Sequence, residues 1–263
     1  MNILVFDIET IPDVESGKRL FDLDGLPAKD IGRAMTQLQK QKTGNEFLPH
    51  HLQRMVAISV VLRTADTFKV WSLGQEDSPE AELLERFYEG IDRFNPTLVS
   101  WNGSGFDLPV IHYRSLLHGI AAARYWETGN DDASFRYNNY LSRFHWRHID
   151  LMDVLAGYQP RGFAPLDQVA TLLGFPGKLG MSGAGVWETW LANDIVAIRD
   201  YCETDVLNTY LIYLRFELMR GQLDRNRYES ECRLVQEQLK AANKSHLAEF
   251  LEAWEKHSKL KQP

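Results

Sequence analysis

Two carboxylic acids follow directly on an apolar run at the start of the chain. Residues 3–6 read Ile-Leu-Val-Phe, which is typical of a strand buried on both faces, and Asp7 and Glu9 come next. Because side chains alternate along a strand, both carboxylates point to the same side, about 7 Å apart. The first cation after them in the sequence is Lys18. A group from outside this segment must therefore offset their repulsion.

A third acid lies in the stretch SWNGSGFDLPVI, residues 100–111. A buried strand is expected to end at Trp101, and a helix to begin near Asp107. One interpretation makes Asp107 the N-cap of that helix, with Pro109 in the first turn. The other makes it a ligand at the carboxyl end of a strand, where the sites of such sheets gather. Taken alone, the motif favours the cap. Asn102 is expected to brace the turn through side-chain hydrogen bonds.

The segment YCETDVLNTYLIYL carries a fourth acid. Asp205 shares one helical face with Ile198, Tyr201, Thr209 and Ile212, because these positions are three or four residues apart. An aspartate on an inward-facing stripe is costly unless it is paired or binds a metal. A core hydroxyl or an arginine would satisfy it equally well, so this motif alone leaves both interpretations open.

Asp7, Glu9, Asp107 and Asp205 are each attached to a segment that should be buried. Clustered carboxylate oxygens suit Mg²⁺ or Mn²⁺, whereas zinc would favour His or Cys. Two such ions would remove the repulsion between Asp7 and Glu9, and two-metal sites cleave phosphodiesters. The four acids therefore predict a site for two divalent ions.

The order of the expected elements predicts an α/β fold, in which strands come first and then alternate with helices. We expect a mixed sheet of about five strands flanked by helices. After the first strand, the expected strands are 55–62, 67–73, 96–101 and a short one near 148–149. The expected helices are 27–42, 80–94, 106–117, 151–157, 165–173, 193–219 and one or two within 224–260.

The composition describes an ordinary globular protein, with 44% hydrophobic residues, 25% charged residues and a net charge of −7. The negative charge argues against binding of nucleic acid by bulk attraction alone. No apolar run reaches the length of a membrane span, and no basic stretch precedes the first apolar run, so neither a membrane partner nor a secretory signal is expected. Two cysteines, Cys202 and Cys232, suggest no disulfide framework. We expect a cytoplasmic protein.

The motifs FDIET, NGSGFD and YCETD, in that order, resemble the three exonuclease motifs of the DnaQ-like (DEDD) 3′–5′ exonucleases, namely D-x-E, N-x₃-[FY]-D and Y-x₃-D. Tyr201 satisfies the tyrosine form of the third motif, and Asp200 stands where the histidine form would need His. The chain thus resembles the DEDDy branch. It looks most similar to standalone exonucleases related to the proofreading domain of family B DNA polymerases.

The resemblance implies roles for individual residues. Asp7, Glu9, Asp107 and Asp205 would be the metal ligands, and Tyr201 would orient the attacking water. Thr10 would lie near the 3′-terminal nucleotide, and Asn102 and Phe106 of the second motif would also contact substrate.

The resemblance also implies a ribonuclease-H-like sheet with the first strand at its centre. We expect residues 1–219 to form the exonuclease domain. Residues 220–263 would form a helical C-terminal extension, packed on that domain or at an oligomer interface.

The expected activity is Mg²⁺- or Mn²⁺-dependent 3′–5′ exonuclease hydrolysis, with two metal ions, that releases nucleoside 5′-monophosphates. The expected partner is the 3′ end of single-stranded nucleic acid, with DNA favoured over RNA. One alternative is an exoribonuclease of the DEDDy type, since the motifs do not report a 2′-hydroxyl contact. The other is a non-catalytic nucleic-acid-binding module, against which the intact set of five residues argues. The sequence names no protein partner.

Other segments support weaker expectations. The arginines and aromatics of residues 124–148 could hold a single strand, but a loop pinned by its own aromatics is favoured. Residues 174–185 are expected to form a mobile connector, in which Lys178 could touch the substrate backbone. Asp150 and Asp153 are expected to lie outside the acid cluster. Asp150, which follows a short strand, could support the site from behind the metal ligands, but a surface role is favoured. Cys202 is expected to be a helix-packing thiol.

Overall fold

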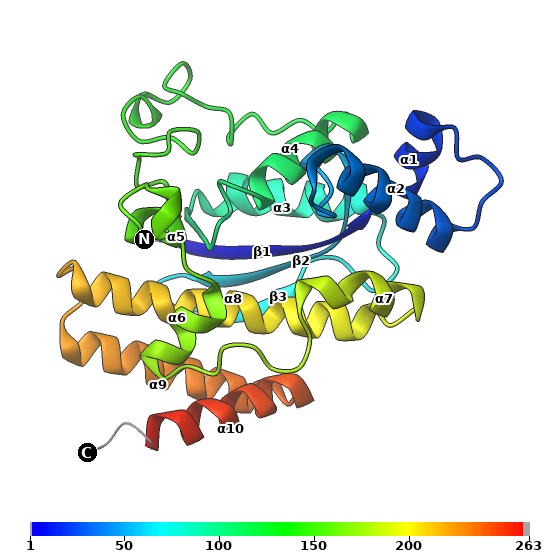
Figure 1. Cartoon of the computed structure of the whole chain (residues 1–263). Coiled ribbons are helices and arrows are strands. Elements are labelled where there is room, and N and C mark those ends of the chain that lie inside the picture. Colours follow the sequence, from blue (N-terminus) through cyan, green and yellow to red (C-terminus); the bar gives the residue numbers. More distant parts are fainter. Residues whose placement is uncertain (1, 260–263) are drawn as a thin grey trace.

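The computed structural model describes residues 2–259 and is built around a five-stranded sheet (Figure 1). The strands lie in the order β3-β2-β1-β4-β5. β1 is antiparallel to β2 and parallel to β4, β2 and β3 form an antiparallel hairpin, and β5 is parallel to β4. The first strand is therefore central, and the ribonuclease-H-like α/β fold is confirmed. The bounds are β1 Ile3–Pro12, β2 Gln53–Arg63, β3 Phe68–Ser72, β4 Thr97–Ser100 and β5 His148–Asp150.

Each of the expected helices is present, and the structure adds two short α-helices, α1 and α7. Both have eight residues or fewer, as do α5 and α6, and so few residues give only a weak helical period in the sequence. Residues 224–260 contribute two helices. The bounds are α1 Val14–Phe21, α2 Ala28–Thr43, α3 Glu80–Phe94, α4 Asp107–His118, α5 Leu151–Leu155, α6 Leu166–Leu173, α7 Val186–Leu191, α8 Ile195–Met219, α9 Arg225–Ala242 and α10 Ser245–Lys259.

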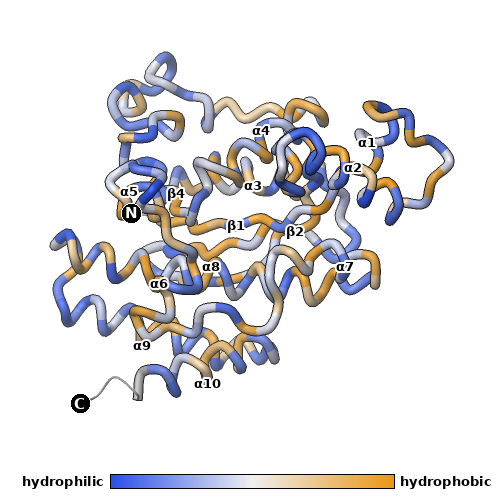
Figure 2. Tube along the Cα trace, viewed as in Figure 1, coloured by the Kyte–Doolittle hydropathy of each residue, from blue (hydrophilic) through white to orange (hydrophobic). Residues whose placement is uncertain are grey.

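Helices cover both faces of β1, which explains its nearly continuous apolar sequence. Leu4, Phe6 and Ile8 face α3 and α4, and they share a core with residues of those helices. Ile3 and Val5 belong to the core on the opposite face, which α8 covers. In Figure 2 the apolar colour runs along β1 and β2, between the two helical layers. The alternation carries Asp7 and Glu9 to the α8 face.

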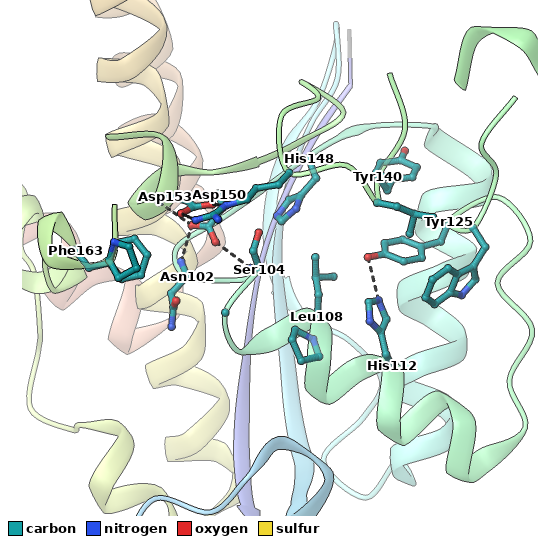
Figure 3. Close-up of a pocket in the computed structure, with 16 residues that line it drawn as sticks. Asn102, Ser104, Leu108, His112, Tyr125, Tyr140, His148, Asp150, Asp153 and Phe163 are labelled. Atoms are coloured by element: carbon teal, nitrogen blue, oxygen red, sulfur yellow. Dashed lines mark hydrogen bonds and ion pairs between the residues drawn. The ribbon is translucent and has the colours of Figure 1, made fainter. Parts of the chain in front are cut away.

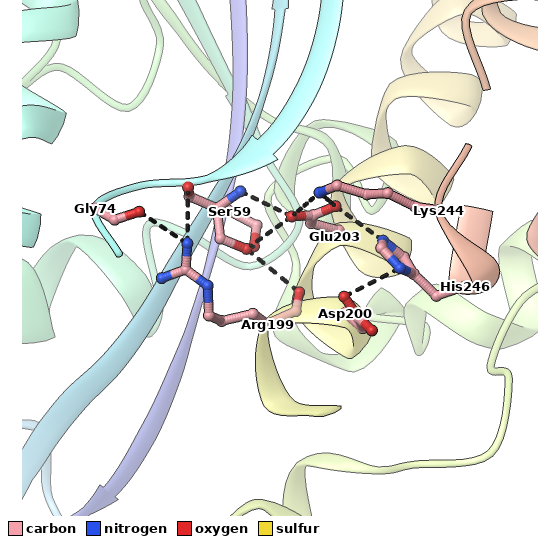
Figure 4. A network of polar contacts seen from close by, with 8 residues as sticks. Ser59, Gly74, Arg199, Asp200, Glu203, Lys244 and His246 are labelled. Carbon is pink, nitrogen blue, oxygen red and sulfur yellow. Dashed lines mark hydrogen bonds and ion pairs between the residues drawn. The ribbon is translucent and has the colours of Figure 1, made fainter. Parts of the chain in front are cut away.

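The longest helix, α8, is fixed to the sheet near its first residues. The side chain of Asp194 caps it, because it accepts a hydrogen bond of 3.0 Å from the Ala197 amide. One turn later the Arg199 guanidinium donates to four consecutive backbone carbonyls at the end of β3, those of residues 72–75. Figure 4 shows the bond to Gly74. These bonds fix the position of α8 against the sheet, and therefore also the positions of the residues that follow on α8.

A polar network joins the C-terminal helices to the middle of α8 (Figure 4). Glu203, which is buried, accepts hydrogen bonds from Lys244 Nζ at 3.0 Å and His246 Nε2 at 2.9 Å, and also from the Ser72 amide. The other ring nitrogen of His246 lies 3.0 Å from Asp200. Both α9 and α10 contact α8, so the network and the apolar contacts hold the same three helices together.

The network shifts the pKa of its titratable groups. Burial by itself would lower the pKa of His246, but hydrogen bonds with Asp200 and Glu203 raise it to about 9. Burial by itself would raise the pKa of Glu203, but His246 and Lys244 lower it to about 2. The charged forms of both groups are therefore favoured at neutral pH.

We expect the free energy of unfolding to depend on pH through His246. A raised pKa stabilises the fold fully below the ordinary value of 6.5, and this contribution is lost as pH rises through about 9. In urea unfolding, His246→Gln should therefore be less stable than wild type by about 2 kcal/mol near pH ~6, and by much less near pH ~10. The exposed His51→Gln is the control. An equal deficit at both pH values would contradict this role for the imidazolium.

Within residues 2–259, no helix is both long enough and apolar enough to cross a membrane.

Candidate active site

Four carboxylates from three separate elements come together beside β1. Asp7 and Glu9 lie on the strand, Asp107 is the first residue of α4, and Asp205 lies in the middle of α8. Asp7 and Asp205 line a cavity of about 500 Å³, together with Tyr201. Glu9 and Asp107 are buried beside them, at 7% and 4% exposure. The structure thus brings together the five residues that the motifs single out.

The position of Asp107 corrects the N-cap interpretation. The N-cap position belongs to Phe106, and Asp107 is already helical. The parallel ladder between β1 and β4 ends at the pair Val5 and Val99, and further along β1 the Ile8 amide donates 3.1 Å to Asp107 Oδ1. The Asp107 carboxylate therefore bonds to the edge of β1 just beyond the last residue pair with β4. This hydrogen bond holds the carboxylate next to Asp7.

Several other buried carboxylates in the protein are paired with arginines. Arg114 pairs with both Asp13 and Glu80, Arg143 with Asp153, and Arg220 with Glu217. Among residues 2–259, no ion pair is formed by Asp7, Glu9, Asp107 or Asp205. The cluster therefore concentrates buried negative charge that no ion pair offsets, unlike the acids bound to Arg114, Arg143 and Arg220.

The pKa values of the cluster reflect that accumulation. Burial, followed by the charges of its neighbours Asp107, Glu9 and Asp205, raises the pKa of Asp7 well above its ordinary value. Burial, followed by the charges of Asp205 and Asp107, raises the pKa of Glu9 as well. Burial raises the pKa of Asp107 to about 7 and that of Asp205 to about 6. Cation binding would relieve an energetic cost that these four acids otherwise carry.

Lys178 brings a positive charge to the acid cluster from a different part of the chain. It lines the same cavity as Asp7 and Asp205, and its charge lowers the pKa of Asp205 and of Glu9. Two hydrogen bonds place it, because the Asn208 side chain binds both the amide and the carbonyl of Gly177. Asn208 lies one turn of α8 after Asp205. The connector is therefore tied to α8 beside the site.

Tyr201 lies one turn before Asp205 on α8. Burial, together with the charges of Asp205 and Glu9, raises the pKa of its hydroxyl strongly, so the phenol stays protonated. Next to it, Cys202 is a buried packing thiol, as expected, and burial raises its pKa. Its sulfur lies 3.6 Å from Asp7 Oδ2, a contact that the sequence did not indicate.

The three residues expected at the substrate have different surroundings. Asn102 lines the cavity. The Thr10 hydroxyl donates to Gln53 Oε1 at 3.0 Å, just after a shift in the β1–β2 register. The Phe106 ring packs against Phe47, with ring centroids 5.5 Å apart. Substrate contact by these residues stays a prediction.

Asp150 is the residue whose role the sequence interpretation got wrong. It is buried, and its carboxylate accepts hydrogen bonds from the amides of Asn102 and Ser104, each at 2.9 Å (Figure 3). It also caps α5. The turn before Asp107 is thus braced by Asp150 and not by the Asn102 side chain. Asn102 has φ 64°, the left-handed conformation that Asn tolerates better than most residues. Asp153 is buried as well and pairs with Arg143.

The segment 124–148 is pinned by its own aromatics, as favoured. Phe135 and Tyr140 are buried, and the Arg147 guanidinium lies 3.8 Å from the Phe135 ring centroid. Arg124 pairs with Asp132. Much of the positive charge is thus used within the loop.

A sequence model of the family described as predicted 3′–5′ exonucleases related to the exonuclease domain of PolB matches residues 45–254. The match covers most of the chain, so the chain belongs to this family of proofreading-like exonucleases. Asp107, Tyr201 and Asp205 lie within the matched residues, and β1 precedes them.

The chain is also similar to individual polymerases. The catalytic polypeptide of DNA polymerase epsilon from Saccharomyces cerevisiae is 27% identical over 148 residues, which are 53% of this chain and 6% of the polymerase polypeptide. Its counterpart from Dictyostelium discoideum is 27% identical over 146 residues, 52% of this chain and 6% of that polypeptide. A solved family B DNA polymerase from the archaeon Pyrobaculum calidifontis matches 83% of this chain and 24% of its own, at 18% identity and a TM-score of 0.48. The chain thus spans only a small part of the length of these relatives.

We expect Asp7→Asn to stabilise the protein in the absence of divalent ions, because it removes one of the repelling charges. Raised acid pKa values stabilise the fold at low pH, and this contribution is lost as pH rises through about 6 to 7. In urea unfolding with EDTA, the variant should exceed wild type by about 1–2 kcal/mol near pH ~8 and by less near pH ~5.

The exposed Glu85→Gln, which removes one charge far from the cluster in sequence, controls for net charge. A variant that is less stable than wild type near pH ~8 would mean that Asp7 makes a structural contribution larger than the repulsion.

Proposed function

We propose that this chain is a metal-dependent 3′–5′ exonuclease that hydrolyses the terminal phosphodiester of single-stranded DNA and releases nucleoside 5′-monophosphates. The observation that carries the proposal is the cluster of four carboxylates without an ion pair, of which Asp7 and Asp205 line one cavity together with the protonated Tyr201. Membership of a PolB-related exonuclease family supports the same chemistry.

The donor set fits hard divalent cations. Oxygen atoms of Asp7, Glu9, Asp107 and Asp205 would hold two Mg²⁺ or Mn²⁺ ions, which prefer carboxylate ligands. One ligating atom each from Asp7, Glu9 and Cys202 already lies within 4.8 Å of the others. The raised thiol pKa keeps Cys202 protonated, so carboxylate oxygens remain the ligands. When bound, such ions lower the pKa of a water molecule and stabilise the charge on the leaving oxygen.

The side chains of the chain supply orientation. Tyr201, kept protonated by its acidic surroundings, would position the attacking water through a hydrogen bond without removing its proton. Lys178, which lines the same cavity, would contact the non-bridging phosphate oxygens. The Ile8 amide fixes one carboxylate oxygen of Asp107, which reduces the reorganisation needed on binding.

The test is a gel assay with a single strand labelled at its 5′ end, offered as DNA and as RNA in Mg²⁺, Mn²⁺ or EDTA. Wild type should produce a ladder that shortens from the 3′ end, with DNA preferred and EDTA abolishing it. Asp205→Asn should lower the rate at least ~100-fold, since it removes a charged ligand, and Tyr201→Phe about 10- to 100-fold. Glu85→Gln should match wild type.

Other outcomes would point to the alternatives. Faster degradation of RNA would favour the exoribonuclease. An intact strand in every metal, with binding still measurable, would favour a non-catalytic binding module. Cleavage that survives in EDTA or in Asp205→Asn would contradict a metal site at these carboxylates.

A further inference from the structure

A second cavity, of about 620 Å³, adjoins the active-site cavity (Figure 3). Its walls are α4, the end of β5 and the segment 125–143. Asn102 and Phe163 line both cavities, so they meet at the turn that precedes Asp107. In Figure 3 these two residues lie together at one end of the pocket, and Tyr125 and His112 lie at the other.

Apolar surface is exposed at this pocket. Trp126 is 51% exposed, Leu141 39% and Phe163 38%, and all three line it. The His112 ring lies 4.9 Å from the Trp126 ring, which gives the pocket one wall of planar rings. Its volume lies within the range of small-ligand sites, about 300–1,000 Å³.

The polar groups of the pocket suit an uncharged ligand. Arg143 pairs with Asp153, and Asp150 adds a further acid to the same side, so a phosphate would find no free cation among the residues that line it. Burial lowers the pKa of His112 to about 4, so its ring is neutral and is hydrogen-bonded to the Tyr125 hydroxyl at 3.0 Å. A flat, neutral ring with polar edges matches these walls better than an anion does.

We propose that this pocket holds the nucleobase of the nucleotide next to the terminal one in a single-stranded substrate, stacked on Trp126. The proposal rests on the proposed exonuclease function, because the pocket shares Asn102 and Phe163 with the cavity in which the terminal phosphodiester would react. Stacking of a base on an aromatic ring does not depend on sequence, so the pocket would accept any of the four bases.

Two substrates distinguish an effect on binding in the pocket from an effect on hydrolysis itself. One is a single-stranded oligonucleotide; the other is the p-nitrophenyl ester of thymidine 5′-monophosphate, in which nitrophenol replaces the preceding nucleotide. Trp126→Ala should lower kcat/KM for the oligonucleotide about tenfold or more, mainly through KM, and leave the rate on the ester unchanged. Trp126→Phe, which keeps a ring, should restore most of the loss. Tyr137→Ala is the control, since Tyr137 is 83% exposed on the same segment and does not line the pocket.

An abasic site moved along the oligonucleotide locates the contact. Wild type should lose activity when the abasic site is next to the terminal nucleotide, and Trp126→Ala should be indifferent to it there. Unchanged oligonucleotide activity in Trp126→Ala, or an equal loss on both substrates, would overturn the pocket while leaving the exonuclease intact. A wild-type protein that hydrolyses neither substrate would overturn the proposed function itself.

Discussion

Negative charge held together at one point of a buried sheet is the constraint on which the site depends. Asp7 and Glu9 cannot separate, because both belong to the central strand and the pleat turns them to the same face. Asp107 and Asp205 are brought to the same place by bonds made elsewhere: the Ile8 amide holds one, and the anchoring of Arg199 sets the helix that carries the other. The unfavourable electrostatic energy is offset by the apolar contacts on both faces of the sheet.

A comparison with Glu203 shows what distinguishes the acids of the cluster. Glu203 is on the same helix as Asp205, yet Lys244 and His246 neutralise it and its pKa is low. Asp205 forms no ion pair with any of residues 2–259, and burial raises its pKa to about 6. Glu203 and Asp205 are thus two residues apart on one helix, and the fold stabilises the charged form of Glu203 but not that of Asp205. Groups with perturbed pKa values in a cavity are candidates for function for this reason.

The turn at residues 102–106 links the two cavities and also carries the chain into Asp107. Asp150 controls this turn from β5 through two backbone amides, so a residue outside the motifs supports the second motif. The same turn would therefore present a metal ligand on one side and part of the proposed base pocket on the other. A change in its conformation would affect both.

The sequence by itself determined the elements and the acids. Apolar runs and caps located the strands and most helices, because period and capping are local properties, and three short motifs identified Asp7, Glu9, Asp107, Tyr201 and Asp205. Of the helices with eight residues or fewer, α5 and α6 were located and α1 and α7 were missed, because so few residues give only a weak period.

Only the tertiary structure decided what surrounds those acids. Three of these surroundings involve residues from different elements: Asp150 is buried, Lys178 lines the cavity of Asp7 and Asp205, and the Cys202 sulfur contacts Asp7. Asp107 belongs to the same group, because as a helix cap it would serve its own helix, and the structure shows it bound to β1. Such contacts depend on how the elements pack, and packing distances are not encoded in the spacing of residues along one segment. Local sequence motifs therefore identify the acids of the cluster, whereas the tertiary fold determines which charges surround them.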